Sequence, residues 1–284
     1  MPKVDLHIHS SVSDGRFSPA ELVRKSAGAG LTLISLTDHD NVDGIPAALE
    51  EAENYPLLKL IPGVEISTDV PDGEVHLLGY FIDYSHQELL LTLKKMRDSR
   101  LERAQGMVEN LAKLGLPLSW ERVLEIAGSG SIGRPHIAQA LLEKGYITTF
   151  KEAFTRYLAW GGPAYIKREK ITPSEGVELI LRAEGLPVLA HPLTVNDPES
   201  LVARLKENGL AGIEAYYKDY TGADTRRLVG LAERFGLIVT SGSDYHGLDD
   251  STETMIGRAA IPLAVEERLI ALAEQRMLKP VNPG

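Results

Sequence analysis

Residues 31–40 read Leu31-Thr32-Leu33-Ile34-Ser35-Leu36-Thr37-Asp38-His39-Asp40, a mostly apolar run that ends in acidic and imidazole side chains. A continuous apolar run of this length is typical of a strand that is buried on both faces of a parallel sheet. The polar residues come where this strand would end. Because α/β proteins place their sites at the carboxyl ends of parallel strands, the stretch predicts a functional site there.

Six other runs along the chain have similar strand character. The seven predicted strands are Lys3 to His9, Leu31 to Thr37, Leu58 to Ser67, Val75 to Ile82, Pro187 to His191, Ala211 to Tyr216, and Leu237 to Ser243. Helical patterns follow several of them, and the first has a clear start: Ser18 as N-cap, Pro19 at the first helical position and Glu21 completing a capping box. Alternating strands and helices predict a mostly parallel α/β sheet closed into a seven-stranded barrel.

The third and fourth predicted strands depart from this alternation. Only residues 68–75 join them, and the turn-forming Pro71-Asp72-Gly73 lies inside that stretch. A parallel crossover needs about a dozen residues or more, so these strands should form an antiparallel hairpin. We therefore expect a distorted (β/α)7 barrel in which His76 lies beside Glu65.

Between residues 86 and 165 the alternation stops, and the sequence predicts helices instead. They cover Gln87 to Leu114, Ser119 to Ala127, Arg134 to Lys144, and Thr149 to Ala159. Leu89, Leu93, Met96, Arg100 and Arg103 lie along one stripe of the first helix. Helices that merely extend the fold would also fit. We favour a barrel domain of residues 1–85 and 166–284, with a helical insertion of residues 86–165 that covers the active site.

Composition limits the function further. The 284 residues are 43% hydrophobic and include no cysteine, so any metal would be held by nitrogen and oxygen, as suits Mn2+, Zn2+ or Fe2+. The formal net charge of −10 argues against a broad groove for long duplex nucleic acid. No apolar stretch is long enough to span a membrane, and no secretory leader pattern opens the sequence, so we expect a cytoplasmic protein.

Six of the eight histidines lie in patterns that suit metal ligands. His7 and His9 are two apart on a strand and share a face, and Asp244 and His246 repeat that spacing after the last strand. Barrel closure would bring the two pairs together. The other histidines in such patterns are His39, His76 and His191.

Two acidic positions complete the candidate set. Glu65 lies inside an apolar strand, where a carboxylate is costly unless it is paired or metal-bound, so it is the candidate to bridge two ions. Asp14 lies in a Ser-Asp-Gly turn, where an Asp is usually structural. Asp38 and Asp40 either orient imidazoles or cap the following segment, and the sequence leaves both interpretations open.

Cationic residues near the insertion could bind phosphate. Arg134 lies at a predicted helix start, where backbone N–H groups and a guanidinium favour an anion. A simple surface arginine at a helix cap is the alternative. Lys167, just after the insertion, is a second candidate of the same kind.

An ordered set of segments in this sequence resembles the polymerase and histidinol phosphatase (PHP) superfamily. The segments are Asp5-Leu6-His7-Ile8-His9, Ser13-Asp14-Gly15, Thr37-Asp38-His39-Asp40, Pro62-Gly63-Val64-Glu65, His76, Ala190-His191-Pro192 and Ser243-Asp244-Tyr245-His246. Within this superfamily, the chain is similar to one branch in its segment Gly133-Arg134-Pro135-His136 and in the length of its insertion. That branch contains the nucleoside 3′,5′-bisphosphate phosphatases and the 5′-3′ exoribonucleases of the RNase AM type.

The resemblance implies a distorted (β/α)7 barrel with two or three divalent ions, Mn2+ first among the expected metals. It assigns His7, His9, Glu65 and Asp244 to the first ion, Glu65, His76 and His191 to the second, and Asp14, His39 and His246 to the third. Asp14 stands where other members place a histidine, so the third ion has a more anionic ligand here. The resemblance also implies that Arg134, His136 and Lys167 contact substrate phosphate.

These expectations describe a phosphoric ester hydrolase. A hydroxide bridging two ions, held by His7, His9, Glu65 and Asp244, would attack phosphorus in a small nucleotide or the 5′ end of a short RNA. Two alternatives remain open at this stage. One is a phosphatase of a small metabolite such as histidinol phosphate, and the other is a non-catalytic module that binds metal or nucleotide.

Overall fold

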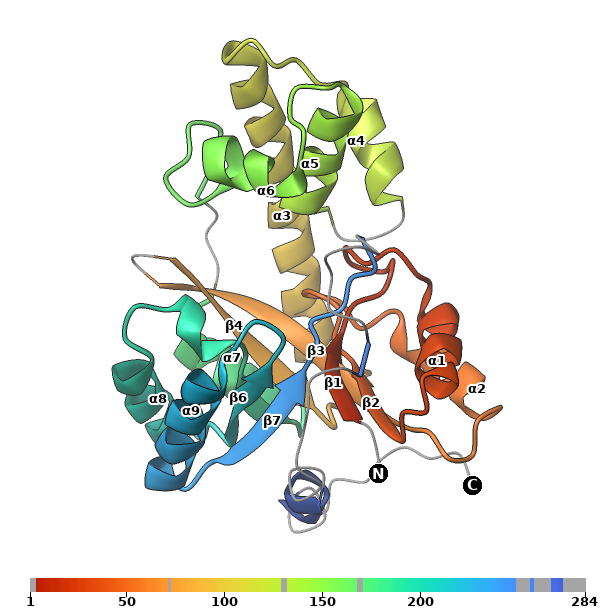
Figure 1. The fold of residues 1–284 in the computed structure, drawn as a ribbon, viewed down its shortest axis with the longest axis vertical. Coiled ribbons are helices and arrows are strands. Elements are labelled where there is room, and N and C mark those ends of the chain that lie inside the picture. The colour runs from red at the N-terminus through yellow and green to blue at the C-terminus, as the bar shows by residue number, and fades with distance from the viewer. Residues whose placement is uncertain are drawn as a thin grey trace.

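The computed structural model describes residues 4–70, 73–128, 132–167, 171–248, 256–257 and 267–272. Within them, seven strands form one sheet whose spatial order follows the chain (Figure 1). They are β1 (Val4–Ile8), β2 (Leu33–Leu36), β3 (Lys59–Val70), β4 (Gly73–Tyr80), β5 (Leu186–Leu189), β6 (Gly212–Tyr217) and β7 (Ile238–Gly242). Each overlaps one predicted run, so the α/β fold prediction is confirmed.

The sheet curls into a nearly closed barrel. The segment after β7 returns to β1, where the His9 N–H donates to the Tyr245 carbonyl at 2.9 Å. Ile8 and Tyr245 also form a parallel bridge. A hydrophobic cluster that includes Leu6, Leu33, Ile61, Leu78 and Val188 joins five of the strands. The two ends of the sheet therefore meet, as cyclic closure requires.

The hairpin of β3 and β4 distorts the barrel as predicted. The two strands pair antiparallel with Ser67 opposite His76, and β4 also runs antiparallel to β5. All other strand pairs are parallel. The predicted turn residues Pro71 and Asp72 lie outside the described residues. Since β4 enters the site from its amino-terminal end, His76 comes early in its strand. Glu65 lies midway along β3, His7 comes late in β1, and the other ligand candidates follow strands.

Five helices pack along the outside of the sheet (Figure 1). They are α1 (Pro19–Gly28), α2 (Ile45–Ala52), α7 (Pro173–Arg182), α8 (Pro198–Glu207) and α9 (Gly222–Phe235). The predicted capping box of α1 is present: the Ser18 N–H donates to Glu21 Oε2 at 2.8 Å, and the Ser18 side chain accepts from the Glu21 N–H. Among the described residues, no helix is both long and apolar enough to cross a membrane.

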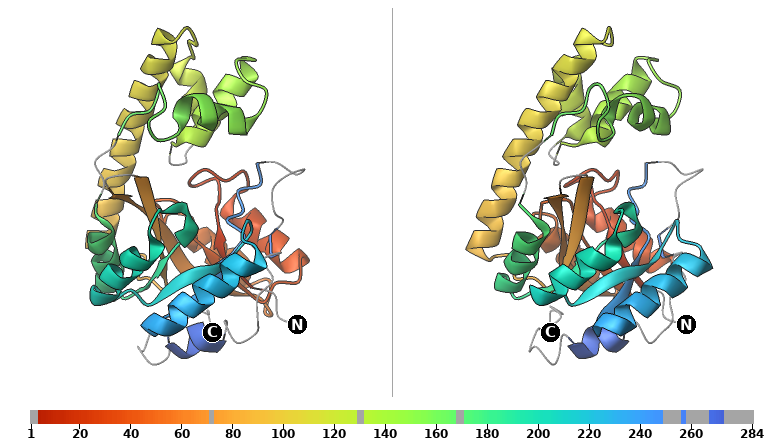
Figure 2. Two further views of the ribbon diagram at one scale, coloured as in Figure 1. Left: turned by 60° about the vertical axis from the view of Figure 1, so that its left-hand side comes forward. Right: turned by 90° about the vertical axis from the view of Figure 1, so that its left-hand side faces the viewer.

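Four further helices and a π-helical turn form a layer above one rim of the barrel (Figure 2). They are α3 (Gln87–Lys113), α4 (Trp120–Ala127), α5 (Arg134–Glu143), α6 (Phe150–Ala153) and the π-helical turn η1 (Phe154–Leu158). The last predicted helix, Thr149 to Ala159, is thus split into two short elements. This layer has its own hydrophobic cluster, which includes Met107, Leu111 and Ile137. The proposed boundaries at 85/86 and 165/166 remain a prediction.

One helix joins the two layers. The first half of α3 buries Leu89, Leu93 and Met96 in the main barrel cluster, and its second half buries Met107 and Leu111 in the upper cluster. Between these halves the helix passes the rim. The stripe read from the sequence therefore changes from apolar to cationic where α3 crosses the site.

Candidate metal centre

The barrel rim gathers the ionisable residues predicted from the sequence. His9, His39, His191, Asp244 and His246 follow β1, β2, β5 or β7, while His7, Glu65 and His76 lie within strands. Asp14 comes from the loop between β1 and α1. We call these nine residues the rim cluster.

Glu65 lies at the centre of the rim cluster and is fully buried. Its Oε2 atom is 3.3 Å from Nε2 of both His7 and His9 and 2.9 Å from Nδ1 of His39. Its Oε1 atom is 2.9 Å from His76 Nδ1 and 3.2 Å from His191 Nε2. A single carboxylate thus faces five imidazoles, which is the arrangement that a bridging ligand between two ions needs.

Asp244 joins the two ends of the barrel. Its Oδ1 atom is 3.4 Å from His7 Nε2 and 3.1 Å from His9 Nε2. Its Oδ2 atom accepts from the Tyr217 hydroxyl at 2.8 Å and from Lys218 Nζ at 3.3 Å. Its backbone has φ of 50°, a left-handed conformation that is uncommon outside glycine but that Asp adopts more readily than most residues. These contacts place the Asp244 carboxylate between the two ends of the barrel.

Asp14 anchors a second group on the side of the helical layer. Its Oδ1 atom is 3.4 Å from His246 Nε2 and 4.0 Å from His9 Nδ1, and its Oδ2 atom is 3.8 Å from His39 Nε2. The Asp14 side chain is only 7% exposed. A turn position that could have been purely structural therefore points into the cluster.

Several buried atoms of the rim cluster have no hydrogen-bond partner within the part of the chain that the structure describes. They are Nε2 of His7, both ring nitrogens of His9, Oδ1 of Asp14, Nδ1 of His39 and Oε2 of Glu65. Buried polar atoms are normally satisfied, so a set of unsatisfied donors and acceptors converging on one point calls for a ligand. Imidazole nitrogens and carboxylate oxygens are the donors that divalent transition metals take. The residues therefore fit metal ions.

The ligand atoms fall into three groups, each with its atoms within 4.8 Å of one another. They are His7, His9, Glu65 and Asp244; His39, Glu65 and His76; and His9, Asp14, His39 and His246. The first matches the expected ligand set. In the second, His39 takes the place expected for His191, which nevertheless lies 3.2 Å from Glu65. The third contains the expected residues together with His9.

Electrostatics prepare these groups for a cation. Burial and the neighbouring His246 lower the pKa of His9 to about 3, and burial lowers the pKa of His76 to about 4. Burial alone would raise the pKa of Glu65, but His39, His7 and His76 outweigh it and hold that pKa well below its usual range. His9 and His76 are therefore in the neutral form that binds metal. Burial opposes the charged form of His7, His39 and His246 as well, but neighbouring carboxylates outweigh it and raise the pKa of these three rings, so they must release a proton when a metal binds.

Glu214 is a functional residue that the sequence analysis missed. It is fully buried in β6, 3.0 Å from His7 Nδ1, and it accepts from the His191 N–H at 2.8 Å. A carboxylate on the far nitrogen of a ligand histidine fixes the ring and its tautomer. The signal was available, because Glu214 interrupts an apolar strand just as Glu65 does.

Asp38 and Asp40 have structural partners rather than imidazoles. Asp38 Oδ1 accepts from the Ser10 N–H and the Ser13 hydroxyl, both at 2.7 Å, and so holds the loop that carries Asp14. Asp40 accepts from the Ser67 N–H at 2.8 Å. These contacts match neither interpretation left open by the sequence: Asp38 bonds to the loop after β1, and Asp40 bonds to β3 and to Arg100, rather than to imidazoles or to the start of α2.

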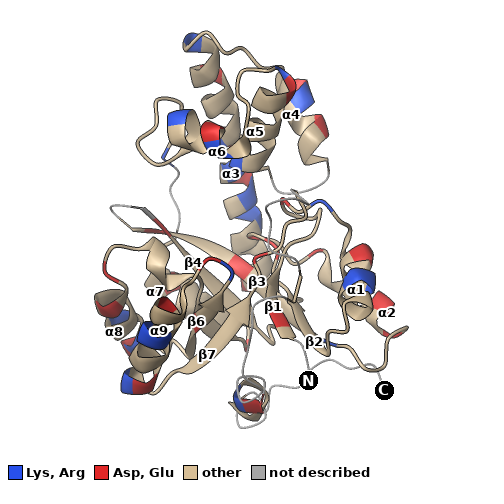
Figure 3. Ribbon diagram, in the orientation of Figure 1, with Lys and Arg blue, Asp and Glu red and all other residues tan. Residues whose placement is uncertain are grey.

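Three arginines border the cluster on the side of the helical layer. Arg100 and Arg103 from α3 and Arg134 from α5 line a pocket of about 170 Å³ together with His39, His76 and His246. Figure 3 shows the cationic positions along α3 where it meets the rim. We call this the arginine pocket. It joins three guanidinium groups to the candidate metal ligands, which suits a phosphoryl group.

Acidic partners hold the arginines in place. Arg100 Nε donates to Asp40 Oδ2 at 2.7 Å. Arg103 Nη1 and Arg134 Nη2 donate to the two oxygens of Glu74, at 3.3 and 2.6 Å. Arg134 was predicted from the sequence, but Arg100 and Arg103 were read only as part of a helical stripe. Their place opposite the metals depends on how α3 packs, which the stripe does not reveal.

The other two predicted phosphate contacts lie elsewhere. His136 Nδ1 accepts from the Gly133 N–H at 2.9 Å and so caps α5. Lys167 Nζ is 3.6 Å from Asp69 and lies over the Trp160 ring, with 58% of its side chain exposed. Neither lines the arginine pocket, so their contact with substrate stays a prediction that rests on the resemblance.

Comparison with known proteins agrees with this geometry. Residues 5–167 match the model of the PHP domain. The chain is 34% identical over 247 residues to the 5′-3′ exoribonuclease Rnm of Salmonella typhimurium, covering 85% of this chain and 84% of the relative. It is 32% identical over 251 residues to the 3′,5′-nucleoside bisphosphate phosphatase of Chromobacterium violaceum, covering 87% and 88%.

A solved structure has the same fold throughout. It comes from Bifidobacterium adolescentis and was described as a proposed metal-dependent phosphoesterase. It superposes with a TM-score of 0.85 at 28% identity, covering 95% of this chain and 96% of the other.

Proposed function

Because this chain belongs to the PHP domain family and is a metal-dependent phosphoesterase, we propose that it hydrolyses nucleoside 3′,5′-bisphosphates and the 5′ ends of short RNA. The observation that supports this proposal is that the rim cluster and the arginine pocket share residues. His39, His76 and His246 belong to the rim cluster and also line the arginine pocket. A phosphoryl group bound there would touch guanidinium groups and the candidate metal ligands at once.

We assign the rim cluster to two or three divalent ions. His7, His9, Glu65 and Asp244 would hold one, Glu65 with His76 and either His39 or His191 a second, and Asp14 with His39 and His246 a third. Mn2+ is the first choice, with Zn2+ or Fe2+ as alternatives, because the donors are imidazole and carboxylate. Such ions lower the pKa of water toward neutrality and polarise phosphoryl oxygens.

The arginines would bind and orient the substrate. Arg100, Arg103 and Arg134 present N–H groups to the pocket from one side, while the rim cluster closes the other. Charge that builds up on the equatorial phosphoryl oxygens would be stabilised by groups already in place. Glu74 and Asp40 keep the guanidinium groups oriented before substrate arrives, which reduces the entropy lost on binding.

Both proposed substrates undergo the same reaction. Water adds to phosphorus, the P–O3′ bond of the first nucleotide breaks, and the 3′ oxygen leaves as a hydroxyl that carries a proton from the water. A bisphosphate then gives a nucleoside 5′-monophosphate and phosphate. An RNA gives a 5′-mononucleotide and a shortened chain that keeps a 5′-phosphate.

Steady-state kinetics in the presence of Mn2+ test the proposal. Substrates are a nucleoside 3′,5′-bisphosphate, a 5′-phosphorylated RNA trinucleotide and histidinol phosphate. We expect kcat/KM for at least one nucleotide substrate to exceed that for histidinol phosphate by a hundredfold or more. Comparable or faster hydrolysis of histidinol phosphate would instead identify a small-metabolite phosphatase.

A further inference from the structure

A second pocket lies next to the arginine pocket, on the outer side of the hairpin. It has a volume of about 260 Å³ and is formed by the hairpin of β3 and β4, the loop after β5 and the start of α8. We call it the α8 pocket. Glu74 lines both this pocket and the arginine pocket, so the two cavities share a wall.

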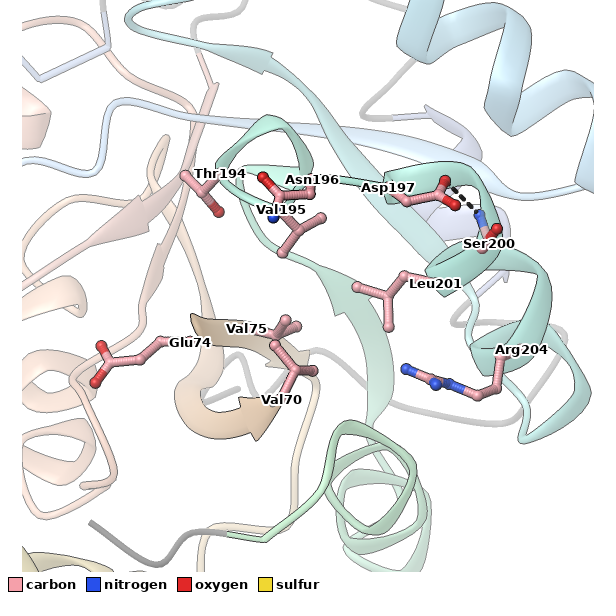
Figure 4. Close-up of a pocket in the computed structure, with 10 residues that line it drawn as sticks. All are labelled: Val70, Glu74, Val75, Thr194, Val195, Asn196, Asp197, Ser200, Leu201 and Arg204. Atoms are coloured by element: carbon pink, nitrogen blue, oxygen red, sulfur yellow. Dashed lines mark hydrogen bonds between the residues drawn. The ribbon is translucent and has the colours of Figure 1, made fainter. Parts of the chain in front are cut away.

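The α8 pocket has an apolar floor and a cationic edge. Figure 4 shows Val70 and Val75 of the hairpin facing Leu201 of α8, with Arg204 reaching toward the hairpin from the next turn. Glu74 points the opposite way, where it meets Arg103 and Arg134. Val75 and Leu201 are almost fully buried, whereas Arg204 is exposed. A nucleobase would fit the apolar floor of the pocket, and a phosphate would fit its cationic edge.

The charges around the pocket favour an anion at Arg204. Among the described residues, Arg204 makes no ion pair or side-chain hydrogen bond. Both acidic residues of the lining have other partners: Asp197 caps α8 by accepting from the Ser200 N–H at 3.1 Å, and Glu74 pairs with Arg103 and Arg134. A free guanidinium on a protein with a formal net charge of −10 is a local site for phosphate.

The pocket is also tied to the rim cluster. Thr194, which lines it, lies in the short 3-10 turn η2 (Pro192–Thr194) directly after His191. The Thr194 hydroxyl donates to the His191 carbonyl at 3.0 Å. A group bound in the α8 pocket would therefore sit beside the His76 and His191 side of the candidate metal centre.

A third pocket borders the arginine pocket from the other direction. It has a volume of about 540 Å³, includes Phe150 and Gln139, and shares Asp14 and Pro135 with the arginine pocket. The phosphoryl site thus lies between two cavities. A nucleoside bisphosphate needs only one nucleoside cavity, whereas an RNA needs one on each side of the phosphorus.

We propose that the α8 pocket binds the nucleotide on the 3′ side of the cleaved bond, with its base against Val75 and Leu201 and its next phosphate at Arg204. This inference rests on the proposed function and makes the protein an exoribonuclease first and a bisphosphatase second. Because the described residues that line the pocket include no aromatic side chain, the base is held by aliphatic contact, and little sequence preference follows.

Two substitutions outside the catalytic residues test this subsite. Arg204→Glu reverses the charge at the edge, and Ser200→Trp fills the mouth from an exposed position whose side chain makes no described hydrogen bond. Arg226→Glu on α9 is the matched control, because Arg226 is also exposed and does not line the pocket. Each protein is assayed with Mn2+ on a 5′-phosphorylated trinucleotide and on a nucleoside 3′,5′-bisphosphate.

We expect both pocket variants to raise KM for the trinucleotide about tenfold while KM for the bisphosphate stays within twofold. Arg204→Glu should also change how the trinucleotide reaction depends on salt. The slope of log(kcat/KM) against log[salt] should become less negative by about 0.7, which is the contribution of one phosphate contact on a single strand. The control variant Arg226→Glu should leave KM unchanged for both substrates.

The two proposals fail in different ways. If the pocket variants keep the parent KM for the trinucleotide, or if the parent cleaves the bisphosphate but not the trinucleotide, the subsite is wrong and the phosphoesterase assignment to nucleotides stands. If the parent cleaves neither nucleotide substrate, both proposals are overturned.

Discussion

The rim cluster and the arginine pocket face each other, yet they are built differently. Most rim residues lie in a strand or within a few residues of its end, so sheet hydrogen bonds fix their positions. The three arginines come from helices whose position depends on side-chain packing in two separate hydrophobic clusters. A site can thus combine ligands placed by backbone pairing with ligands placed by helix packing, and the two parts should respond differently to perturbation.

Metal removal should give the largest effect and act on the rim cluster alone. We expect chelation by EDTA to abolish phosphate ester hydrolysis and Mn2+ to restore it. Ions that bind only the folded protein add about 4 kcal/mol at a thousandfold excess over Kd, so Mn2+ should raise Tm by several degrees. Full activity in exhaustively chelated protein would contradict the assignment of the rim cluster to metal.

Loss of one rim ligand should come next. His9→Ala and Asp244→Ala should each lower kcat by about 10³-fold or more, equivalent to roughly 4 kcal/mol of transition-state stabilisation. Circular dichroism should show the fold intact. His86→Ala is the control, because that histidine caps α3 away from the rim. Unchanged turnover in either rim variant would refute the metal-ligand assignment.

The arginine pocket should be separable from metal binding. Arg103→Ala and Arg134→Ala should lower kcat/KM by about 10- to 100-fold, as expected for losing a charge-assisted contact to phosphate. The rise in Tm on adding Mn2+ should be unchanged, since neither residue contacts the candidate ligand atoms. Arg103→Lys should recover only part of the activity because lysine lacks the planar fork. Abolition of the Tm rise in these variants would show that the two parts are not independent.

We expect the smallest effect from removing the charge of Glu74, which pairs with two arginines of the arginine pocket. The Glu74 carboxylate occupies N–H groups of Arg103 and Arg134 that a phosphate would also use. Glu74→Gln keeps the shape and removes the charge, so inorganic phosphate should inhibit hydrolysis with a Ki lowered by about two- to fivefold at low salt. Glu74 also orients the guanidinium groups, so a raised Ki would mean that this orientation outweighs the competition between Glu74 and phosphate.

The difference between residues placed by strands and residues placed by helix packing also explains which parts of the site could be predicted from the sequence. Strand ends are visible as apolar runs that stop at polar residues, so the positions of His39, His191 and Asp244 at one rim follow from the pattern. The hairpin followed from the short connection of residues 68–75. Glu214 was readable by the argument used for Glu65 and was overlooked. Arg100 and Arg103 were not readable as site residues, because a helical stripe gives the face of a helix but not what that face meets.

The continuous helix α3 has a consequence for how this fold can change. At 27 residues it is about 40 Å long, at 1.5 Å per residue, and it is embedded in hydrophobic contacts near both ends. Inserting a single residue between Met96 and Ala104 would rotate everything beyond it by about 100°. The barrel would still fold, but the upper helices would be swung out of register with it. Length variation in this family should therefore accumulate in the loops after α3, and chimaeras that exchange the upper layer should join within a loop rather than inside this helix.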